Sequence, residues 1–209
     1  MGGGCEGRVN GQRLYSGRIL DVDIDRVRFP DGSTGELEII RHPGASAVVP
    51  VAQSDGASQP IVTLIRQYRY EKEVFMCEIP AGKLDPGETP EACARRELRE
   101  ETGLYGGQLD YLSTIYTTPG FTDEVIHLYV ALYLESGTPS HEANEFIEVH
   151  EFPLNFLLDL IDGGKISDAK TICALMLAAR WLERRKNCLL YTSDAADDTP
   201  CVDLGGRRI

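Results

Sequence analysis

The first part of the chain alternates apolar and acidic residues. Leu20, Val22 and Ile24 each precede an aspartate, which is the period-two pattern of a β-strand with one covered face. A Pro-Asp-Gly turn at 30–32 separates this stretch from a second alternating one around 37–39. We therefore predict a β-hairpin ahead of the main domain. The Gly-rich first dozen residues are expected to be loose.

After the break at Pro43-Gly44, the apolar pattern changes to continuous runs rich in β-branched residues. Runs of this kind are typical of strands buried on both faces. A loop is expected at Pro80-Ala81-Gly82, directly after the third run. The predicted strands are 46–52, 61–70, 74–79, 111–116 and 125–134.

Three segments carry helical periodicity. The first is 90–102, the second is 154–161 and is closed by Gly163, and the third is 168–186. The order of strands, helix, strands and helices predicts an α+β fold with a mixed sheet between helices, rather than a regular βαβ repeat.

Composition and charge narrow the class of protein. The chain has 209 residues, which suits one domain with a full core, and its net charge is −12. Such acidity disfavours nucleic acid and anionic membranes as partners, and it equally repels a polyphosphate, so phosphate chemistry would require bound cations. Six scattered cysteines argue against a disulfide framework or zinc site. Without a signal peptide or a run of about 18 apolar residues, we expect a cytoplasmic protein.

The last stretch, 187–209, has no helical or strand period and looks unrelated to what precedes it. It is similar to the translated adapter sequence found at the ends of metagenomic reading frames, and the alternative is a genuine disordered tail. We therefore divide the chain into an N-terminal arm and hairpin at 1–44, a main domain at 45–186, and a non-native or disordered tail at 187–209.

The helix at 90–102 carries the candidate chemistry. At about 100° per residue, Glu97, Glu100 and Glu101 lie side by side along one edge of its apolar stripe. Like charges one turn apart cost about 0.2–0.5 kcal/mol per pair, and a divalent cation reverses the sign of that cost. Oxygen ligands with no His or Cys nearby favour Mg²⁺ or Mn²⁺. The alternative is a solvated charged face, paired locally by interleaved arginines.

The spacing of the whole segment decides between these interpretations. Gly82, Glu88, Arg96, the three glutamates and Gly103 occupy every fixed position of the Nudix box, so the segment resembles the Nudix hydrolases. The resemblance implies an α/β/α sandwich in which Glu97, Glu100 and Glu101 bind the metals, with the Ala81 carbonyl as a further ligand. It also implies a structural ion pair between Glu88 and Arg96. Metal-activated water then cleaves a diphosphate, with Glu100 and Glu101 as catalytic residues.

Motifs beyond the box resemble the ADP-ribose pyrophosphatase branch of this family. They include LIRQYRY, EIPAGKL, TTPGFTDE and NEFIEV. Pro119, which that branch places about fifteen residues after the box, is followed here by Gly120 and Phe121. In that branch a late loop glutamate activates water or binds a further metal, and the candidates are Glu142 and Glu145. The implied reaction converts ADP-ribose and water into AMP and ribose 5-phosphate.

Two other functions remain open. The substrate is alternatively another nucleoside diphosphate sugar, such as a UDP- or GDP-sugar, because base-reading contacts cannot be seen in sequence. A non-catalytic ADP-ribose sensor is disfavoured, since the box is intact and no basic DNA-binding segment is present.

Arginine and tyrosine residues stand at the end of the predicted strand 61–70. Arg66 and Arg69 suit phosphate oxygens, and Tyr68 suits stacking on a base. The alternative is a strand end held by salt bridges. The resemblance also implies a homodimer, in which N-terminal arms pair between subunits. An edge hairpin is suited to that role because exposed strand edges invite pairing.

Overall fold

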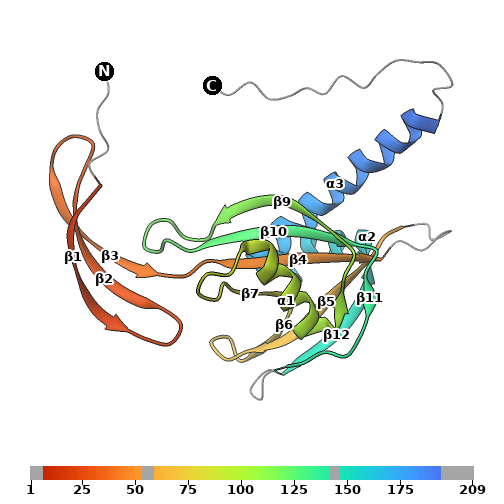
Figure 1. Ribbon diagram of the computed structural model, residues 1–209, viewed down its shortest axis with the longest axis horizontal. Coiled ribbons are helices and arrows are strands. Elements are labelled where there is room, and N and C mark those ends of the chain that lie inside the picture. Colours follow the sequence, from red (N-terminus) through yellow and green to blue (C-terminus); the bar gives the residue numbers. More distant parts are fainter. Residues whose placement is uncertain (1–6, 53–58, 142–145, 194–209) are drawn as a thin grey trace.

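The computed structural model describes residues 7–52, 59–141 and 146–193. An N-terminal sheet, which we call the arm, stands away from a larger body built on a mixed sheet (Figure 1). The arm has three antiparallel strands in the order β1-β2-β3. Their bounds are Gly7–Ser16 for β1, Asp21–Arg28 for β2 and Thr34–Arg41 for β3.

The prediction of loose residues at the N-terminus was wrong from Gly7 onward, because those residues form β1. All ten residues of β1 are exposed, so the strand has no apolar alternation that a sequence pattern would reveal. Cross-strand charge pairs hold it instead. Arg13 pairs with Asp21 and Asp23 on β2, and Arg8 lies 2.8 Å from Asp25. The predicted hairpin is therefore a three-stranded sheet.

The body sheet runs in the order β12-β5-β4-β10-β9, with β6 added to β5 and β7 added to β4. The sheet is mixed, because β4 and β10 are parallel and the other pairs are antiparallel. A separate short pair joins β8 (Leu104–Tyr105) and β11 (Glu135–Ser136). The sheet strands are β4 (Ala45–Ala52), β5 (Ile61–Arg69), β6 (Val74–Glu78), β7 (Ala81–Lys83), β9 (Gln108–Tyr116), β10 (Val125–Leu132) and β12 (Ile147–Pro153).

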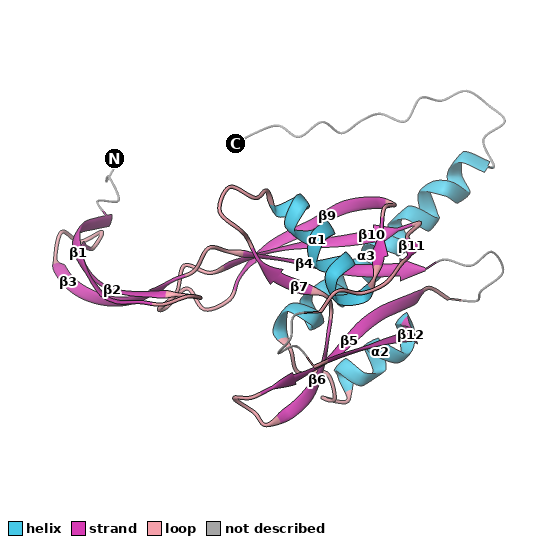
Figure 2. Ribbon diagram, turned by 60° about the horizontal axis from the view of Figure 1, so that its bottom comes forward, coloured by secondary structure: helices cyan, strands magenta, loops and turns pink. Residues whose placement is uncertain are grey.

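Helices cover both faces of this sheet (Figure 2). On one face α1 (Pro90–Thr102) buries Ala94 and Leu98 against Val48. On the other face lie α2 (Leu154–Asp162) and α3 (Ala169–Ser193), packed on the larger core cluster. Successive residues of β4 point to opposite faces, so Val48 joins the cluster under α1 while Ala47 and Val49 join the larger one. The expected α+β arrangement of a mixed sheet between helices is confirmed.

Three boundaries differ from the sequence expectations. Ala81–Lys83 is a strand, not a loop, and Ala47 of β4 is the register partner of Ala81. β12 was not predicted, because its exposed polar residues break the apolar pattern. α3 continues to Ser193, past the expected end at Lys186, as helix propagation allows where no Pro or Gly intervenes. The rest of the predicted tail lies outside the described residues. Among the described helices, none is long and apolar enough to cross a membrane.

Candidate metal and diphosphate site

Local signals fix both ends of α1. The Thr89 hydroxyl accepts a hydrogen bond from the Ala92 amide at 3.2 Å, and Pro90 occupies the first turn. Gly103 adopts a left-handed conformation with φ 77°, and its amide donates to the Arg99 carbonyl at 2.9 Å. The buried apolar stripe then sets the rotation of the helix, so that the glutamates face the β7 segment.

Two of the three glutamates bracket the Ala81-Gly82 peptide. Glu101 is only 5% exposed, and its carboxylate accepts a hydrogen bond from the Ala81 amide at 3.0 Å. The Glu97 carboxylate lies directly over Gly82, where a Cβ atom would overlap it. Only glycine therefore allows this approach. Glu100 is more open, with its side chain 45% exposed.

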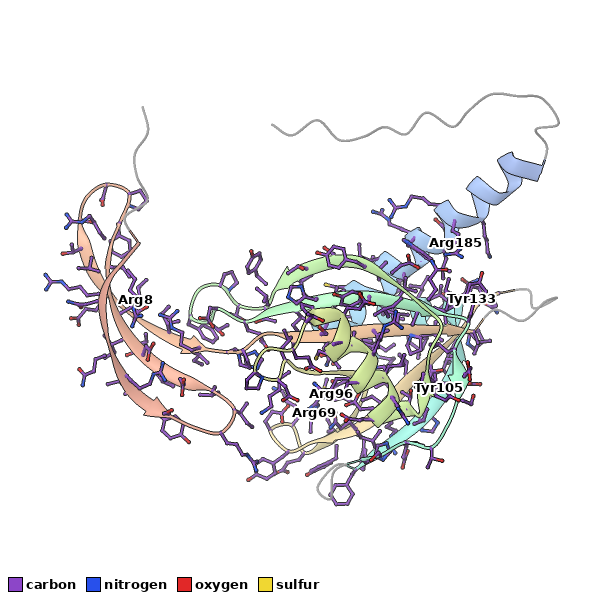
Figure 3. All side chains as sticks on the ribbon, in the orientation of Figure 1. Arg8, Arg69, Arg96, Tyr105, Tyr133 and Arg185 are labelled. Atoms are coloured by element: carbon purple, nitrogen blue, oxygen red, sulfur yellow. The ribbon has the colours of Figure 1, made fainter. Side chains whose placement is uncertain are left out.

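Arg96 organises the acidic groups around it and projects from α1 (Figure 3). Its guanidinium makes a two-pronged pair with Glu88, with both N···O distances at 2.9 Å. Its Nη1 atom also reaches Glu97 Oε1 at 2.5 Å and Glu100 Oε2 at 3.1 Å. The expected ion pair between Glu88 and Arg96 is thus present, and one guanidinium contacts three carboxylates, which leaves an excess of negative charge.

The donor set suits a hard divalent cation. Glu97, Glu100 and Glu101 offer carboxylate oxygens, and the Ala81 carbonyl belongs to the peptide that two of them bracket. Oxygen donors of this kind are preferred by Mg²⁺, Mn²⁺ and Ca²⁺. Among the described residues, no three acidic, His or Cys side chains converge on one metal position. Arg96 instead lies between Glu97 and Glu100, so a cation would compete with its guanidinium.

A cavity of about 660 Å³ lies beside Glu100. Three arginines of α1 line it, together with Tyr105, Thr138 and Ser140. Arg99 lies over the Tyr105 ring, 5.8 Å from its centroid. The cavity therefore brings positive charge next to the acidic groups of α1, as a site for a polyphosphate requires.

The segment that leads to the candidate bases is fixed to α1. The Ser140 amide donates to the Glu100 carbonyl at 2.8 Å, and His141 Nε2 lies 2.8 Å from the Glu101 carbonyl. Glu142 and Glu145 themselves lie outside the described residues. The described chain up to His141 is therefore held on the backbone of the two glutamates.

The two strand arginines are already paired within the protein. Arg69 holds Glu78 through two bonds of 2.6 and 2.7 Å. Arg66 contacts Glu148 at 2.8 Å and stacks over Phe75, 4.2 Å from its centroid. Tyr68 meets the same Phe75 ring edge-on at 5.4 Å. This geometry matches the alternative interpretation from the sequence, in which salt bridges hold the end of the strand.

Sequence reasoning missed a buried charge network around Glu78, which is 2% exposed. Lys170 of α3 contacts both Glu78 and Asp168, and Asp168 caps the helix by accepting from the Thr171 amide at 2.9 Å. Burial alone would raise the pKa of Glu78, but Arg69 and Lys170 outweigh burial and lower it. Only the Asp168 cap has a local sequence signal.

Pro119, Gly120 and Phe121 lie in the turn between β9 and β10. Phe121 is 50% exposed. Its carbonyl accepts a hydrogen bond from the Ile40 amide at 2.8 Å. This turn is therefore attached to the base of the arm.

The Glu88–Arg96 pair makes stability depend on pH. Hydrogen bonding to Arg96 lowers the pKa of Glu88 to about 2, below the value of about 4.3 in an unfolded chain. Its contribution is present above pH 4.3 and is lost as the pH falls toward 2. We expect the difference in unfolding free energy between the wild type and Glu88→Gln to shrink over that range. Urea titrations between pH 7 and 3 measure it, and a constant difference would contradict the assignment.

Comparison with known proteins shows which family the chain is similar to. A family model described as the NUDIX domain matches residues 41–175. The methanol dehydrogenase activator of Bacillus methanolicus is 38% identical over 172 residues, which cover 81% of this chain and 90% of that protein. The ADP-ribose pyrophosphatase of Bacillus subtilis (strain 168) is 37% identical over 166 residues, covering 78% and 87%. The crystal structure of an ADP compounds hydrolase aligns with a TM-score of 0.71 at 25% identity, covering 85% and 94%.

Proposed function

Because this chain belongs to the Nudix family, we propose that it hydrolyses the pyrophosphate bond of ADP-ribose, giving AMP and ribose 5-phosphate, with Mg²⁺ as cofactor and Mn²⁺ as a substitute. One structural observation carries the proposal. Glu97 and Glu101 bracket the Ala81-Gly82 peptide, and Glu100 of the same helix lines an arginine-rich cavity. The similarity to an ADP-ribose pyrophosphatase over most of both chains supports the choice of substrate.

Glu97, Glu100, Glu101 and the Ala81 carbonyl would hold the cation. A divalent cation bound there neutralises the diphosphate, polarises phosphorus and activates water. Arg96 orients two of these carboxylates through Nη1 while Glu88 holds its other nitrogen atoms. This division of contacts keeps the helix glutamates preorganised, which is how a site lowers the free energy of a charged transition state.

A base is needed to take a proton from the attacking water. We assign that role to Glu145 or Glu142, since both follow a segment bonded to the backbone of Glu100 and Glu101. A general base has to reach the water directly or through one other molecule.

The remaining substrate contacts are assigned to two regions. Pro119, Gly120 and the half-exposed Phe121 offer an apolar surface for the nucleoside. Arg66, Arg69 and Tyr68 offer guanidinium and aromatic groups. Of the two arginines, Arg66 is the freer to turn toward a ligand, because Arg69 is held by the buried Glu78.

A substrate panel tests the proposal. Purified protein is assayed with ADP-ribose, UDP- and GDP-sugars and dinucleotides, each with Mg²⁺ or Mn²⁺ and with EDTA. We expect ADP-ribose to give the highest kcat/KM, AMP and ribose 5-phosphate as products, and no turnover with EDTA. A preference for a UDP- or GDP-sugar would overturn the substrate, and the absence of any diphosphate cleavage would overturn the activity.

We also propose that the protein is a homodimer whose arms pair between subunits. The fully exposed strand β1 supports this, because it presents Leu14 at 54% exposure and Tyr15 at 59% beside an open strand edge. Sedimentation equilibrium should give the mass of two chains, and Leu14→Glu should shift the equilibrium toward the monomer. Phe156→Glu on α2, at 46% exposure, is the matched control and should leave the dimer intact. A wild-type monomer at every concentration would contradict the proposal.

A further inference from the structure

The turn that carries Pro119, Gly120 and Phe121 is paired with the last arm strand. The Ile40 amide donates to the Phe121 carbonyl at 2.8 Å, and the Asp123 amide donates to the Ile40 carbonyl at 3.2 Å. Thr122 therefore forms a parallel bridge with Ile40. The turn is thus joined to β3 by a single β-bridge.

Asp123 strengthens this junction through its side chain. One carboxylate oxygen accepts from the His42 amide at 2.8 Å, and the other accepts from Arg41 Nη1 at 3.1 Å. Charge-assisted hydrogen bonds of this kind are about twice as strong as neutral ones. The junction thus combines backbone pairing with an ion pair across 82 residues of sequence.

Arg41 is fixed from the arm side. Its Nε atom lies 3.2 Å from Asp23, and its Nη2 atom contacts Asp25. Both aspartates are nearly buried, at 2% and 4% exposure. A planar guanidinium that is held at two positions has little freedom at the third. A movement of the arm would therefore move Arg41, and Arg41 would move Asp123 with it.

The turn is braced internally as well. The Thr118 carbonyl accepts from the Phe121 amide at 3.2 Å and from the Thr122 amide at 3.1 Å. The Thr117 hydroxyl donates to Glu124 at 2.8 Å. A shift at Asp123 consequently moves the segment from Pro119 to Phe121 with it.

We infer that Arg41 and Asp123 are positioning residues that couple the arm to the substrate turn, so that the affinity for the nucleotide depends on where the arm is held. The inference rests on the proposed function, which places the nucleoside on this turn. It gives the arm a role in the site through contacts within one chain. It also means that any partner that moves the arm alters binding of the nucleotide more than the chemical step.

Steady-state kinetics test the coupling. Asp123→Asn keeps the shape of the side chain but removes its charge. Arg41→Lys keeps the positive charge but removes the planar guanidinium, which contacts three carboxylates at once. We expect each to raise KM for ADP-ribose about tenfold, as the loss of one charge-assisted hydrogen bond implies, while kcat stays within about twofold of the wild type. Asp31→Asn is the matched control, because it makes the same chemical change within the arm, where Asp31 accepts hydrogen bonds from Ser33, and its KM should not change.

Amide hydrogen exchange gives a readout that does not depend on catalysis. The amides of Phe121 and Asp123 report the turn and its pairing with β3, and both should exchange faster in Asp123→Asn and Arg41→Lys but not in Asp31→Asn. Unchanged exchange, or faster exchange with an unchanged KM, overturns the coupling. If the wild type does not cleave ADP-ribose, the proposed function fails, and exchange still decides whether the arm holds the turn.

Discussion

Replacing Glu101 with glutamine is expected to lower kcat/KM for ADP-ribose by at least about a hundredfold. A metal ligand contributes several kcal/mol of transition-state charge stabilisation, and each 1.4 kcal/mol is about a factor of ten in rate. The fold should survive, because glutamine retains an oxygen that accepts the bond now made by the Ala81 amide at 3.0 Å. Steady-state kinetics with Mg²⁺ measure the loss, and calorimetric titration with Mn²⁺ measures the weakened metal affinity directly.

The same helix supplies the control. Glu91 is an acidic residue of the first turn of α1, its side chain is 59% exposed, and it pairs with Arg95 at 3.0 Å. Glu91→Gln removes an equal charge from the helix without touching the Ala81-Gly82 peptide. It should retain wild-type kinetics and metal affinity. Equal rates for Glu101→Gln and the wild type would defeat the assignment of Glu101 as a metal ligand.

The bounds and the rotation of α1 could be predicted from the sequence almost entirely, because the residues that determine them lie within or next to the helix. The Thr89 cap, Pro90 and the left-handed Gly103 define its ends. The apolar stripe defines its rotation, so that Glu97 and Glu101 fall on one edge. Even the packing of Glu97 on Gly82 follows from a residue type at a fixed spacing. A site built from one helix and the strand just before it is predictable because few long-range contacts intervene.

Elements held by long-range polar contacts were not predictable. β1 and β12 expose most of their residues and lack the period-two pattern. Arg69 was predicted to contact phosphate because of its residue type, yet its partner is Glu78. Lys170, the second cation on Glu78, lies 92 residues further along the chain from Glu78. Likewise, nothing near Asp123 indicates Arg41. Charge pairs between distant segments leave no periodic trace, since any acidic and basic residues would satisfy the same local pattern.

Removing the charge of Glu78 should have the largest effect on stability. Glu78 is 2% exposed, and its carboxylate contacts both Arg69 on β5 and Lys170 on α3. Glu78→Gln leaves these cations without their full counter-charge. Breaking one side of a buried pair costs about 3–5 kcal/mol, and the 35% exposure of Arg69 places the expected loss near the lower end. Urea unfolding should show the loss of free energy, and thermal unfolding should show a fall in Tm of about 10 °C.

A second carboxylate paired with a β5 arginine gives the comparison. Glu148 contacts Arg66 at 2.8 Å, but its side chain is 52% exposed, so Glu148→Gln should leave the unfolding free energy close to that of the wild type. The two variants make the same chemical change and differ chiefly in burial. If both lose the same small amount of stability, the Glu78 network contributes no more than a surface pair. If only Glu78→Gln loses unfolding free energy, burial of the charges, and not the number of ion pairs, explains how this network stabilises the packing of α3 on the sheet.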